Sequence, residues 1–211
     1  IQEKISKILK EKVILFGSGR TDTGVHALEQ SAHFECKKRI ANYDKFLKSI
    51  NHFLNKDFVT ILKIKKKNQN FHSRFSAKIR IYKYVIINRL SRPVLDKNRG
   101  WHIMNKLDLE MMKKASKKLV GTNDFSTFRA SSCRAKSPIK TMRSVKIRSK
   151  NNKIEIEFQS QSFLQQQVRS MVGCLKYVSE KKWTLKKFIF IMNSKKRILC
   201  APPAPPEGLY L

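Results

Sequence analysis

The stretch Arg143–Gln159 reads RSVKIRSKNNKIEIEFQ and holds two strand patterns on either side of a tight turn. After the turn, apolar residues at 154, 156 and 158 alternate with polar residues at 155, 157 and 159, the period of a strand that buries one face. Asn151 and Asn152 tolerate the left-handed backbone that a two-residue hairpin loop requires. The stretch therefore predicts an antiparallel hairpin with one face in a core.

Patterns on both sides of this hairpin predict the rest of the second half of the chain. A run of β-branched and aromatic residues predicts a strand over Ile81–Ile87. Apolar residues at helical spacing predict helices over Asp108–Val120 and Ser162–Val178, and a further helix and a short strand, Gly208–Leu211, follow. The order β-α-β-β-α-β is that of the ferredoxin-like split βαβ fold.

The first half shows the same order without its opening strand. Its expected elements are helix Gln2–Lys10, strands Val13–Phe16 and Glu29–Cys36, helix Tyr43–Leu54 and strand Phe58–Lys65. We expect a natural form of the protein to carry a further strand upstream of Ile1. The prediction is an α/β (α+β) fold of two tandem ferredoxin-like halves, with largely antiparallel sheets flanking a central cleft. The incomplete first half takes residues 1–70 and the second takes 71–211.

The charge balance indicates the class of partner. Lys and Arg number 46 against 15 Asp and Glu, a formal net charge of +31 in 211 residues. So basic a body repels itself unless it lies against a polyanion, and nucleic acid is the usual one. The alternative is a lysine-rich surface that is merely solvated. No segment is apolar and long enough to span a membrane, so a membrane partner is not expected.

The cysteines and histidines give no sign of a metal site. The four cysteines, Cys36, Cys133, Cys174 and Cys200, are widely scattered and form no CxxC pair. They predict reduced thiols and a cytoplasmic location. The five histidines are similarly dispersed, and His26 is expected to be a polar packing residue.

Residues 16–27, FGSGRTDTGVHA, place three of the chain's seven glycines around a single carboxylate, Asp22. Val25-His26 stand where a nucleotide phosphate loop needs lysine and a hydroxyl, and Asp22 occupies the third glycine of the dinucleotide pattern. What remains is a carboxylate on a rigid turn, with Arg20 able to orient it or to hold an anionic substrate. The alternative is a loop that only needs positive φ.

This loop resembles the signature of the TruA-type tRNA pseudouridine synthases. Four more blocks similar to that family follow in order and span nearly the whole chain: Phe71–Ala77 leading into Tyr82–Tyr84, Gly121–Arg129, Val168–Gly173 and Ala201–Leu211. The resemblance implies an isomerase that breaks the N-glycosidic bond of a uridine in the tRNA anticodon stem-loop and rejoins the uracil through carbon. It implies tRNA as partner, a homodimer, and neither metal nor organic cofactor.

The resemblance also assigns roles to residues. Asp22 matches the catalytic aspartate, which acts either as nucleophile on the sugar or as base toward a sugar proton. The carboxylate must stay ionised for either role, so we expect a cation against it, and Arg169, the family's helix arginine, is the candidate. Tyr82 is expected to stack on the uracil. Arg20 is expected to help hold the extruded nucleotide. Without the resemblance, Tyr82 is also consistent with a half-buried strand aromatic and Arg20 with a local ion pair.

A basic stretch between residues 125 and 148 predicts phosphate contacts, with Arg129, Arg134 and Lys136 as RNA-binding candidates; a solvated loop is the alternative. Gln165–Gln167 stand where the family commonly shows histidines, so no role of those histidines is carried over. Two other functions are compatible with the same residues. One is a non-catalytic RNA-binding module, and the other is a related synthase acting on another RNA.

Overall fold

The computed structural model describes residues 1–211, which divide into two compact units. The first unit contains residues 1–20 and 29–77, and the second contains residues 21–28 and 78–211. Residues 21–28 thus pack with the second unit, whereas the sequence interpretation assigned the glycine-rich loop to the first half. None of the helices combines the length and the apolar character needed to cross a membrane.

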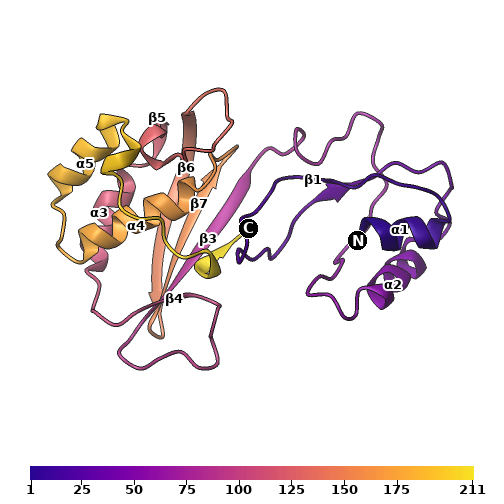
Figure 1. Ribbon diagram of the computed structural model, residues 1–211, viewed down its shortest axis with the longest axis horizontal. Coiled ribbons are helices and arrows are strands. Elements are labelled where there is room, and N and C mark those ends of the chain that lie inside the picture. The colour runs from indigo at the N-terminus through magenta and orange to yellow at the C-terminus, as the bar shows by residue number, and fades with distance from the viewer. The chain divides into compact units, whose positions relative to one another are not determined.

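The first unit is built around two short amphipathic helices (Figure 1). Apolar side chains of both helices, among them Ile5, Leu9, Phe46 and Ile50, form its small core. Asn42 caps the second helix by accepting a hydrogen bond from the backbone N–H of Lys45. The elements are α1 (Gln2–Leu9), β1 (Phe16–Gly17), β2 (Ala32–His33) and α2 (Tyr43–Phe53).

The helices of this unit agree with the sequence prediction, but its strands are shorter than predicted. Strands were expected over 13–16 and 29–36, and only a two-residue antiparallel ladder forms, pairing Phe16 with His33 and Gly17 with Ala32. A strand needs a partner along its length, and β1 and β2 pair only with each other.

The prediction of a strand over Phe58–Lys65 is wrong, because these residues form no strand. The Asn51 side chain on α2 donates to the carbonyl of Ile61 at 2.9 Å and accepts from its N–H at 2.7 Å. The main chain of this segment is therefore bonded to a helix side chain at Ile61 instead of to a neighbouring strand.

The second unit contains one mixed sheet and three helices. Its sheet has the order β4-β3-β7-β6-β5, and β8 pairs with the same β3 strand; every pair is antiparallel except β3 with β4. This confirms the α+β class with mostly antiparallel strands. The elements are β3 (Arg80–Asn88), β4 (Trp101–Ile103), α3 (Leu109–Lys117), β5 (Gly121–Asp124), β6 (Ile139–Lys150), β7 (Lys153–Ser160), α4 (Gln167–Ser179), α5 (Leu185–Ser194) and β8 (Leu209–Tyr210), with 3₁₀ turns η1 (Ser126–Phe128), η2 (Arg197–Leu199) and η3 (Pro206–Gly208).

The hairpin that the sequence predicted is present between β6 and β7. Asn151 and Asn152 adopt φ of 51° and 60°, as a two-residue loop of this kind requires. The apolar residues of β7 at 154, 156 and 158 are all buried, and the residues between them are only partly buried. The alternation in the sequence therefore corresponds to the two faces of the sheet, with the apolar residues on the buried face.

Helices α3, α4 and α5 lie against one face of this sheet (Figure 1). Met112 of α3, Met171 of α4 and Phe188 of α5 join the buried strand residues in a single core. Asp108 and Thr184 cap α3 and α5 by accepting hydrogen bonds from backbone N–H groups of the first turn. These helices leave the N-terminal end of α4 beside the C-terminal segment of the chain, where the candidate site forms.

Candidate active site

The loop that carries Asp22 is joined to the C-terminal end of the chain by main-chain hydrogen bonds. The N–H of His26 donates to the carbonyl of Leu209 at 2.9 Å, and the N–H of Leu211 donates back to His26 at 3.0 Å. A third bond, from Leu28 to Leu211, measures 2.7 Å. The end of the loop thus runs alongside β8 and is hydrogen-bonded to it.

Gly24 is the glycine of this loop that the backbone requires. Its φ is +83°, and a Cβ added there would lie 3.1 Å from Cγ of Pro206. The N–H of Val25 donates to the Asp22 carbonyl at 3.1 Å, which closes the turn around the carboxylate. The expectation of a rigid, glycine-dependent turn at Asp22 is confirmed at this position.

His26 serves the packing of the loop. Its ring stacks on that of Tyr210 with centroids 4.7 Å apart, and its Nε2 lies 2.9 Å from the Asn98 carbonyl oxygen, to which the Nε2–H tautomer donates. The Tyr210 hydroxyl donates to the Arg99 carbonyl at 2.6 Å. The interpretation of His26 as a polar packing residue agrees with these contacts.

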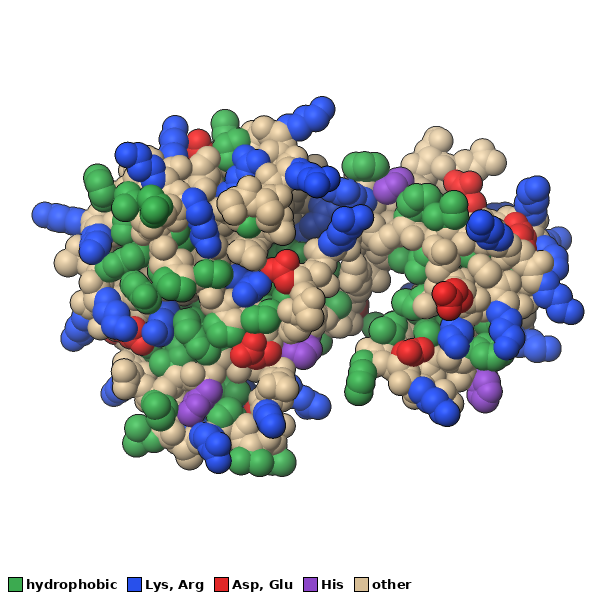
Figure 2. Space-filling view, in the orientation of Figure 1, with side chains coloured by type: hydrophobic (Ala, Val, Ile, Leu, Met, Phe, Trp, Pro, Cys, Tyr) green, Lys and Arg blue, Asp and Glu red, His purple; other side chains and the backbone are tan.

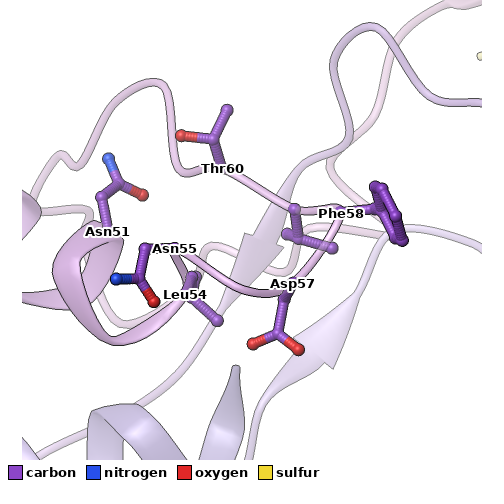
Figure 3. Close-up of a pocket in the computed structure, with 7 residues that line it drawn as sticks. Asn51, Leu54, Asn55, Asp57, Phe58 and Thr60 are labelled. Atoms are coloured by element: carbon purple, nitrogen blue, oxygen red, sulfur yellow. The ribbon is translucent and has the colours of Figure 1, made fainter.

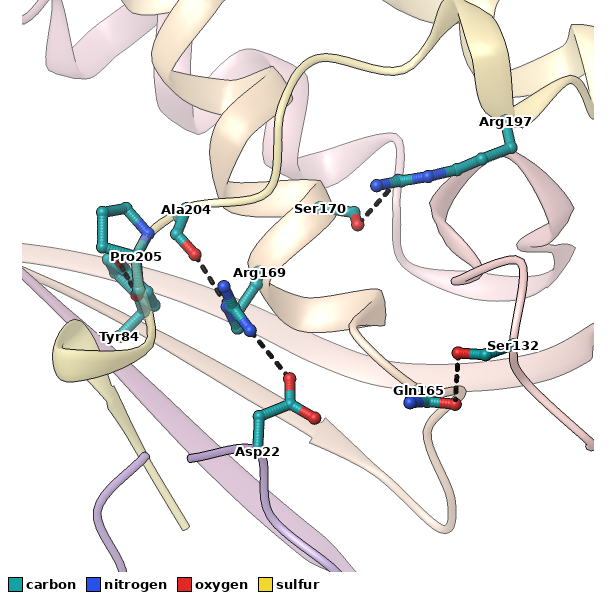
Figure 4. A network of polar contacts seen from close by, with 9 residues as sticks. All are labelled: Asp22, Tyr84, Ser132, Gln165, Arg169, Ser170, Arg197, Ala204 and Pro205. Atoms are coloured by element: carbon teal, nitrogen blue, oxygen red, sulfur yellow. Dashed lines mark hydrogen bonds and ion pairs between the residues drawn. The ribbon is translucent and has the colours of Figure 1, made fainter. Parts of the chain in front are cut away.

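Asp22 and Arg169 form an ion pair. Nη1 of Arg169, on α4, lies 2.7 Å from Oδ2 of Asp22 (Figure 4). The exposed fractions of the two side chains are 13% for Arg169 and 32% for Asp22, so the pair is partly shielded while the carboxylate still reaches solvent. The cation that the sequence analysis expected against Asp22 is the one it named.

A second interaction fixes the direction of the Arg169 guanidinium. Its Nε donates to the carbonyl of Ala204 at 2.7 Å, and the N–H of Ala204 donates to the carbonyl of Arg169 at 2.9 Å. Figure 4 shows the guanidinium between the Ala204 carbonyl and the Asp22 carboxylate. We call residues Ala201–Pro206, which supply this contact, the proline segment.

The proline segment and Gly208, which follows it closely, approach α4 and β3 because glycines stand at the two contact points. A Cβ on Gly173 of α4 would lie 2.1 Å from the carbonyl oxygen of Pro202. A Cβ on Gly208 would lie 2.5 Å from Cζ of Tyr84. Tyr84, fully buried in β3, donates its hydroxyl to the carbonyl of Pro205 at 2.7 Å. The sequence alone assigns no role to these residues; a glycine inside a predicted helix and the paired prolines are the signals that it contains.

Tyr82 lies on the same face of β3 as Tyr84, two residues earlier. Its ring is half-buried and lies perpendicular to the Phe163 ring, with centroids 5.0 Å apart. Burial raises the pKa of Tyr82 above its usual value; the charge of Arg80 opposes this shift and the charge of Asp22 adds to it. Tyr82 is therefore a neutral phenol within the electrostatic reach of Asp22.

The other substrate-binding candidate, Arg20, is the last residue of the first unit before the Asp22 loop. Its side chain is exposed. It belongs to a different unit from Asp22, Tyr82 and Arg169, which all lie in the second.

The three RNA-binding candidates differ in their surroundings. Arg129 is partly buried and its guanidinium donates to the carbonyl of Cys133, so it supports the loop that carries it. Arg134 and Lys136 are exposed. Burial raises the pKa of the Cys133 thiol, but hydrogen bonds from backbone N–H groups and the charge of Arg129 outweigh burial and leave that pKa below its usual value.

The glutamines at the family's histidine positions join this loop to α4. The Gln165 carbonyl accepts from the N–H of Ala130 at 3.1 Å, and its side chain lies 3.4 Å from the Ser132 hydroxyl (Figure 4). Gln167 is buried and its Oε1 accepts from the N–H of Leu164 at 2.8 Å. These glutamines thus have structural contacts of their own.

A hollow in the first unit is not a second candidate site. Its volume is about 360 Å³, and one continuous stretch of chain forms it (Figure 3). No site residue predicted from the sequence lines it, and no lysine, arginine or histidine does; the lining residues are Asn51, Leu54, Asn55, Asp57, Phe58, Val59 and Thr60. Cationic side chains are scattered over the visible surface of the protein and are more numerous there than acidic ones (Figure 2).

Comparison with known proteins gives consistent results over the whole chain. A family model described as tRNA pseudouridine synthase matches residues 115–211. The chain is 72% identical over 211 residues to tRNA pseudouridine synthase A of Pelagibacter ubique, covering 100% of the chain and 86% of that protein. It is 37% identical to the protein of that name from Maricaulis maris and 39% identical to that from Parvibaculum lavamentivorans, again over 100% of the chain and 86% and 85% of those proteins.

Proposed function

The chain belongs to the tRNA pseudouridine synthase family, and we propose that it uses Asp22 to isomerise uridines of the tRNA anticodon stem-loop. Membership makes it an isomerase that converts tRNA uridine to pseudouridine. The observation that carries the assignment of Asp22 is its contact with Arg169 at 2.7 Å, because it holds one partly exposed carboxylate against a cation on a fixed backbone.

The reaction conserves every atom of the nucleotide. The bond between C1′ and N1 of uracil breaks, the base turns, C5 bonds to C1′, and the proton on C5 is lost while N1 gains one. Asp22 serves as nucleophile on the sugar or as base toward a sugar proton; both roles require the ionised form that the Arg169 cation favours. Arg169 is thus proposed to keep the carboxylate charged and aimed at the ribose.

Tyr82 is proposed to stack on the extruded uracil and to offer its hydroxyl as a hydrogen-bond donor. The support is its half-buried ring on the core face of β3 and its neutral phenol, since burial raises the pKa of Tyr82. A stacked uridine has to leave the stem before it can react, at a cost of roughly a few kcal/mol. Arg20 is proposed, from the family resemblance, to hold the extruded state.

Phosphate contacts are proposed for the loop that follows η1. Arg134 and Lys136 are exposed there and free to reach the RNA backbone, while Arg129 adds charge and holds the shape of the loop through the Cys133 carbonyl. Such contacts give affinity and register without reading base identity. The charge of +31 is consistent with a polyanionic substrate.

We also propose a homodimer in the cytoplasm, by analogy with the family, and a ferredoxin-like second unit. The strand order β8-β3-β7-β6 supports the last point, since it places the fourth strand beside the first and the third beside the second, as in a split βαβ unit. Sedimentation velocity of the free protein would test the dimer; a single species at 24.7 kDa would exclude it.

The function is tested with an unmodified tRNA transcript and with a transcript whose anticodon stem-loop uridines are replaced by cytidine. We expect pseudouridine in the first transcript, mapped to the stem-loop, and none in the second. Tight binding without product would favour a non-catalytic RNA-binding module. Product only on an unrelated RNA would favour a synthase with another substrate.

A further inference from the structure

Both partners of the Asp22–Arg169 pair depend on the C-terminal segment of the chain. Arg169 bonds to Ala204 through its Nε and its carbonyl, and the Asp22 loop bonds to Leu209 and Leu211 through His26 and Leu28. Whatever fixes the path of this segment between α4 and β3 therefore also sets the geometry of the pair.

We propose that Tyr84 is a positioning residue for the reaction: its hydroxyl holds the proline segment in the place where Ala204 orients the Arg169 guanidinium toward Asp22. The inference rests on the proposed function of Asp22. It assigns a role to a side chain that does not touch the carboxylate and lies buried below the segment.

The hydroxyl of Tyr84 has one partner, and that partner is in the segment. Tyr84 is fully buried at the centre of β3, paired with Ile156 on one side and Leu209 on the other. Its ring is nearly perpendicular to that of Trp101, and its hydroxyl donates to the carbonyl of Pro205 at 2.7 Å. A buried hydroxyl in apolar surroundings is costly unless bonded, so this bond ties the segment to the rigid sheet.

Two consecutive carbonyls of the proline segment point to different partners. The carbonyl of Ala204 accepts from Arg169 and the next one, of Pro205, accepts from Tyr84 (Figure 4). Pro205 has φ of −54° and ψ of 146°, an extended conformation in which successive carbonyls turn away from each other. Holding one carbonyl therefore fixes the direction of the other.

The prolines explain why an external bond is needed. Proline has no N–H, so Pro205 and Pro206 donate no main-chain hydrogen bond to α4 or β3. The N–H of Ala204 donates to the main-chain carbonyl of Arg169, which ties the segment to the backbone of α4 but not to the sheet. Between Ala204 and the start of β8, the Tyr84 hydroxyl supplies the link to the sheet.

The burial of Tyr84 is consistent with a donor and not with an acid. Burial, with the charge of Glu207 adding to it, raises the pKa of Tyr84 well above its usual range, and the charge of Arg169 opposes that shift. The phenol keeps its proton at any working pH, so the bond to Pro205 does not switch with pH.

The test is a double-mutant cycle between Tyr84→Phe and Arg169→Lys. Phenylalanine keeps the ring and removes only the donor, and lysine keeps the charge but has no Nε–H for Ala204 to accept. We would measure single-turnover pseudouridine formation at saturating protein, the KM for tRNA, and the unfolding midpoint. Tyr177→Phe, near the C-terminal end of α4, is the matched control that removes a hydroxyl elsewhere.

We expect Tyr84→Phe alone to lower the single-turnover rate about tenfold, with the KM within about twofold of wild type, because contacts to RNA are untouched. In the Arg169→Lys background Tyr84→Phe should lower the rate no further, since there is no oriented guanidinium left to lose. Tyr177→Phe should keep the wild-type rate. An equal loss in both backgrounds, or a loss of unfolding midpoint without a loss of rate, would overturn the proposal.

Should Tyr84→Phe fail to fold, Pro205→Gly tests the same idea by releasing the fixed φ of the segment, and its loss of rate should likewise vanish in the Arg169→Lys background. Asp22→Asn distinguishes a failure of the positioning role of Tyr84 from a failure of the proposed function of Asp22. If it abolishes product while Tyr84→Phe and Pro205→Gly leave the rate unchanged, only the positioning role is overturned. If Asp22→Asn retains the wild-type rate, the proposed function and this inference are both overturned.

Discussion

Replacing Gly173 by alanine should disturb the active site from the opposite side of the proline segment. The added Cβ would lie 2.1 Å from the Pro202 carbonyl oxygen and 3.3 Å from its carbonyl carbon. Because real contacts of this kind stay beyond 3.0 Å and the obstacle is backbone, the segment has to move away from α4 by nearly 1 Å. Such a movement breaks or weakens both hydrogen bonds between Arg169 and Ala204.

The size of the effect follows from three contributions. Overpacking of this kind costs about 1–3 kcal/mol. The two hydrogen bonds contribute about 1 kcal/mol each. Alanine inside a helix is more favourable than glycine by about 1 kcal/mol, which offsets part of the loss. The expected decrease in the free energy of unfolding is therefore about 2–4 kcal/mol, less than the whole stability of a typical protein, so the variant should still fold.

The assay is urea unfolding followed by circular dichroism, together with single-turnover pseudouridine formation under conditions where Gly173→Ala is folded. We expect a lower unfolding midpoint and a rate reduced at least about tenfold, because Arg169 loses its orientation. Gly17→Ala is the control for stability, since its Cβ would meet nothing nearer than 3.6 Å. Wild-type stability and rate in Gly173→Ala would show that contact with Gly173 does not place the proline segment.

Three further predictions concern pH, stability and RNA affinity. Burial raises the pKa of Tyr82, so its phenol stays neutral. Tyr82→Phe should therefore leave the shape of the rate profile between pH 7 and 9 unchanged. If the wild-type rate falls in that range and the fall disappears in Tyr82→Phe, this prediction is contradicted. Burial raises the pKa of Glu180, but Lys176 and Lys182 outweigh burial and lower that pKa overall. The ionised carboxylate therefore stabilises the folded protein at pH values above its unfolded pKa, and this stabilisation is lost as the pH falls through its pKa in the folded protein. Glu180→Gln should thus cost about 1–2 kcal/mol in urea unfolding at pH 7 and much less at pH 3, and equal costs would exclude the effect. Replacing Arg134 or Lys136 by alanine should reduce the slope of log Kd for tRNA against log salt by about one each, and an unchanged slope would remove the residue from the phosphate contacts.

The sequence predicts those elements best whose pattern is long and one-sided. The alternation at 154–158 and the Asn151-Asn152 turn predict the hairpin, because the period of two repeats over most of a strand that buries one face. Strands β4 and β5 have three and four residues, too few for a period to appear. In the first half, residues 58–65 have high β propensity but form no strand, because no neighbouring strand is there to pair with them. The propensity of a segment does not show whether a partner strand exists.

The candidate site divides in the same way. The local motif identifies Asp22. The family resemblance, together with the need for a cation, identifies Arg169, so both residues can be predicted from the sequence. The contacts that orient Arg169 are not, because Tyr84 and Pro205 are 121 residues apart and Arg169 and Ala204 are 35 apart. Nor does a basic residue reveal whether its guanidinium faces solvent or, like that of Arg129, a carbonyl of its own loop.

Single-turnover kinetics of Asp22→Asn show whether this carboxylate takes part in the chemistry, since they separate binding from the chemical step. Asp57→Asn, exposed in the first unit, is the matched control for loss of one carboxylate. With protein saturating over an unmodified tRNA transcript, we predict that Asp57→Asn forms pseudouridine at the wild-type rate. Asp22→Asn should bind tRNA within about threefold of wild type yet form no product above the uncatalysed background. Formation of pseudouridine by Asp22→Asn at the wild-type rate would contradict the account.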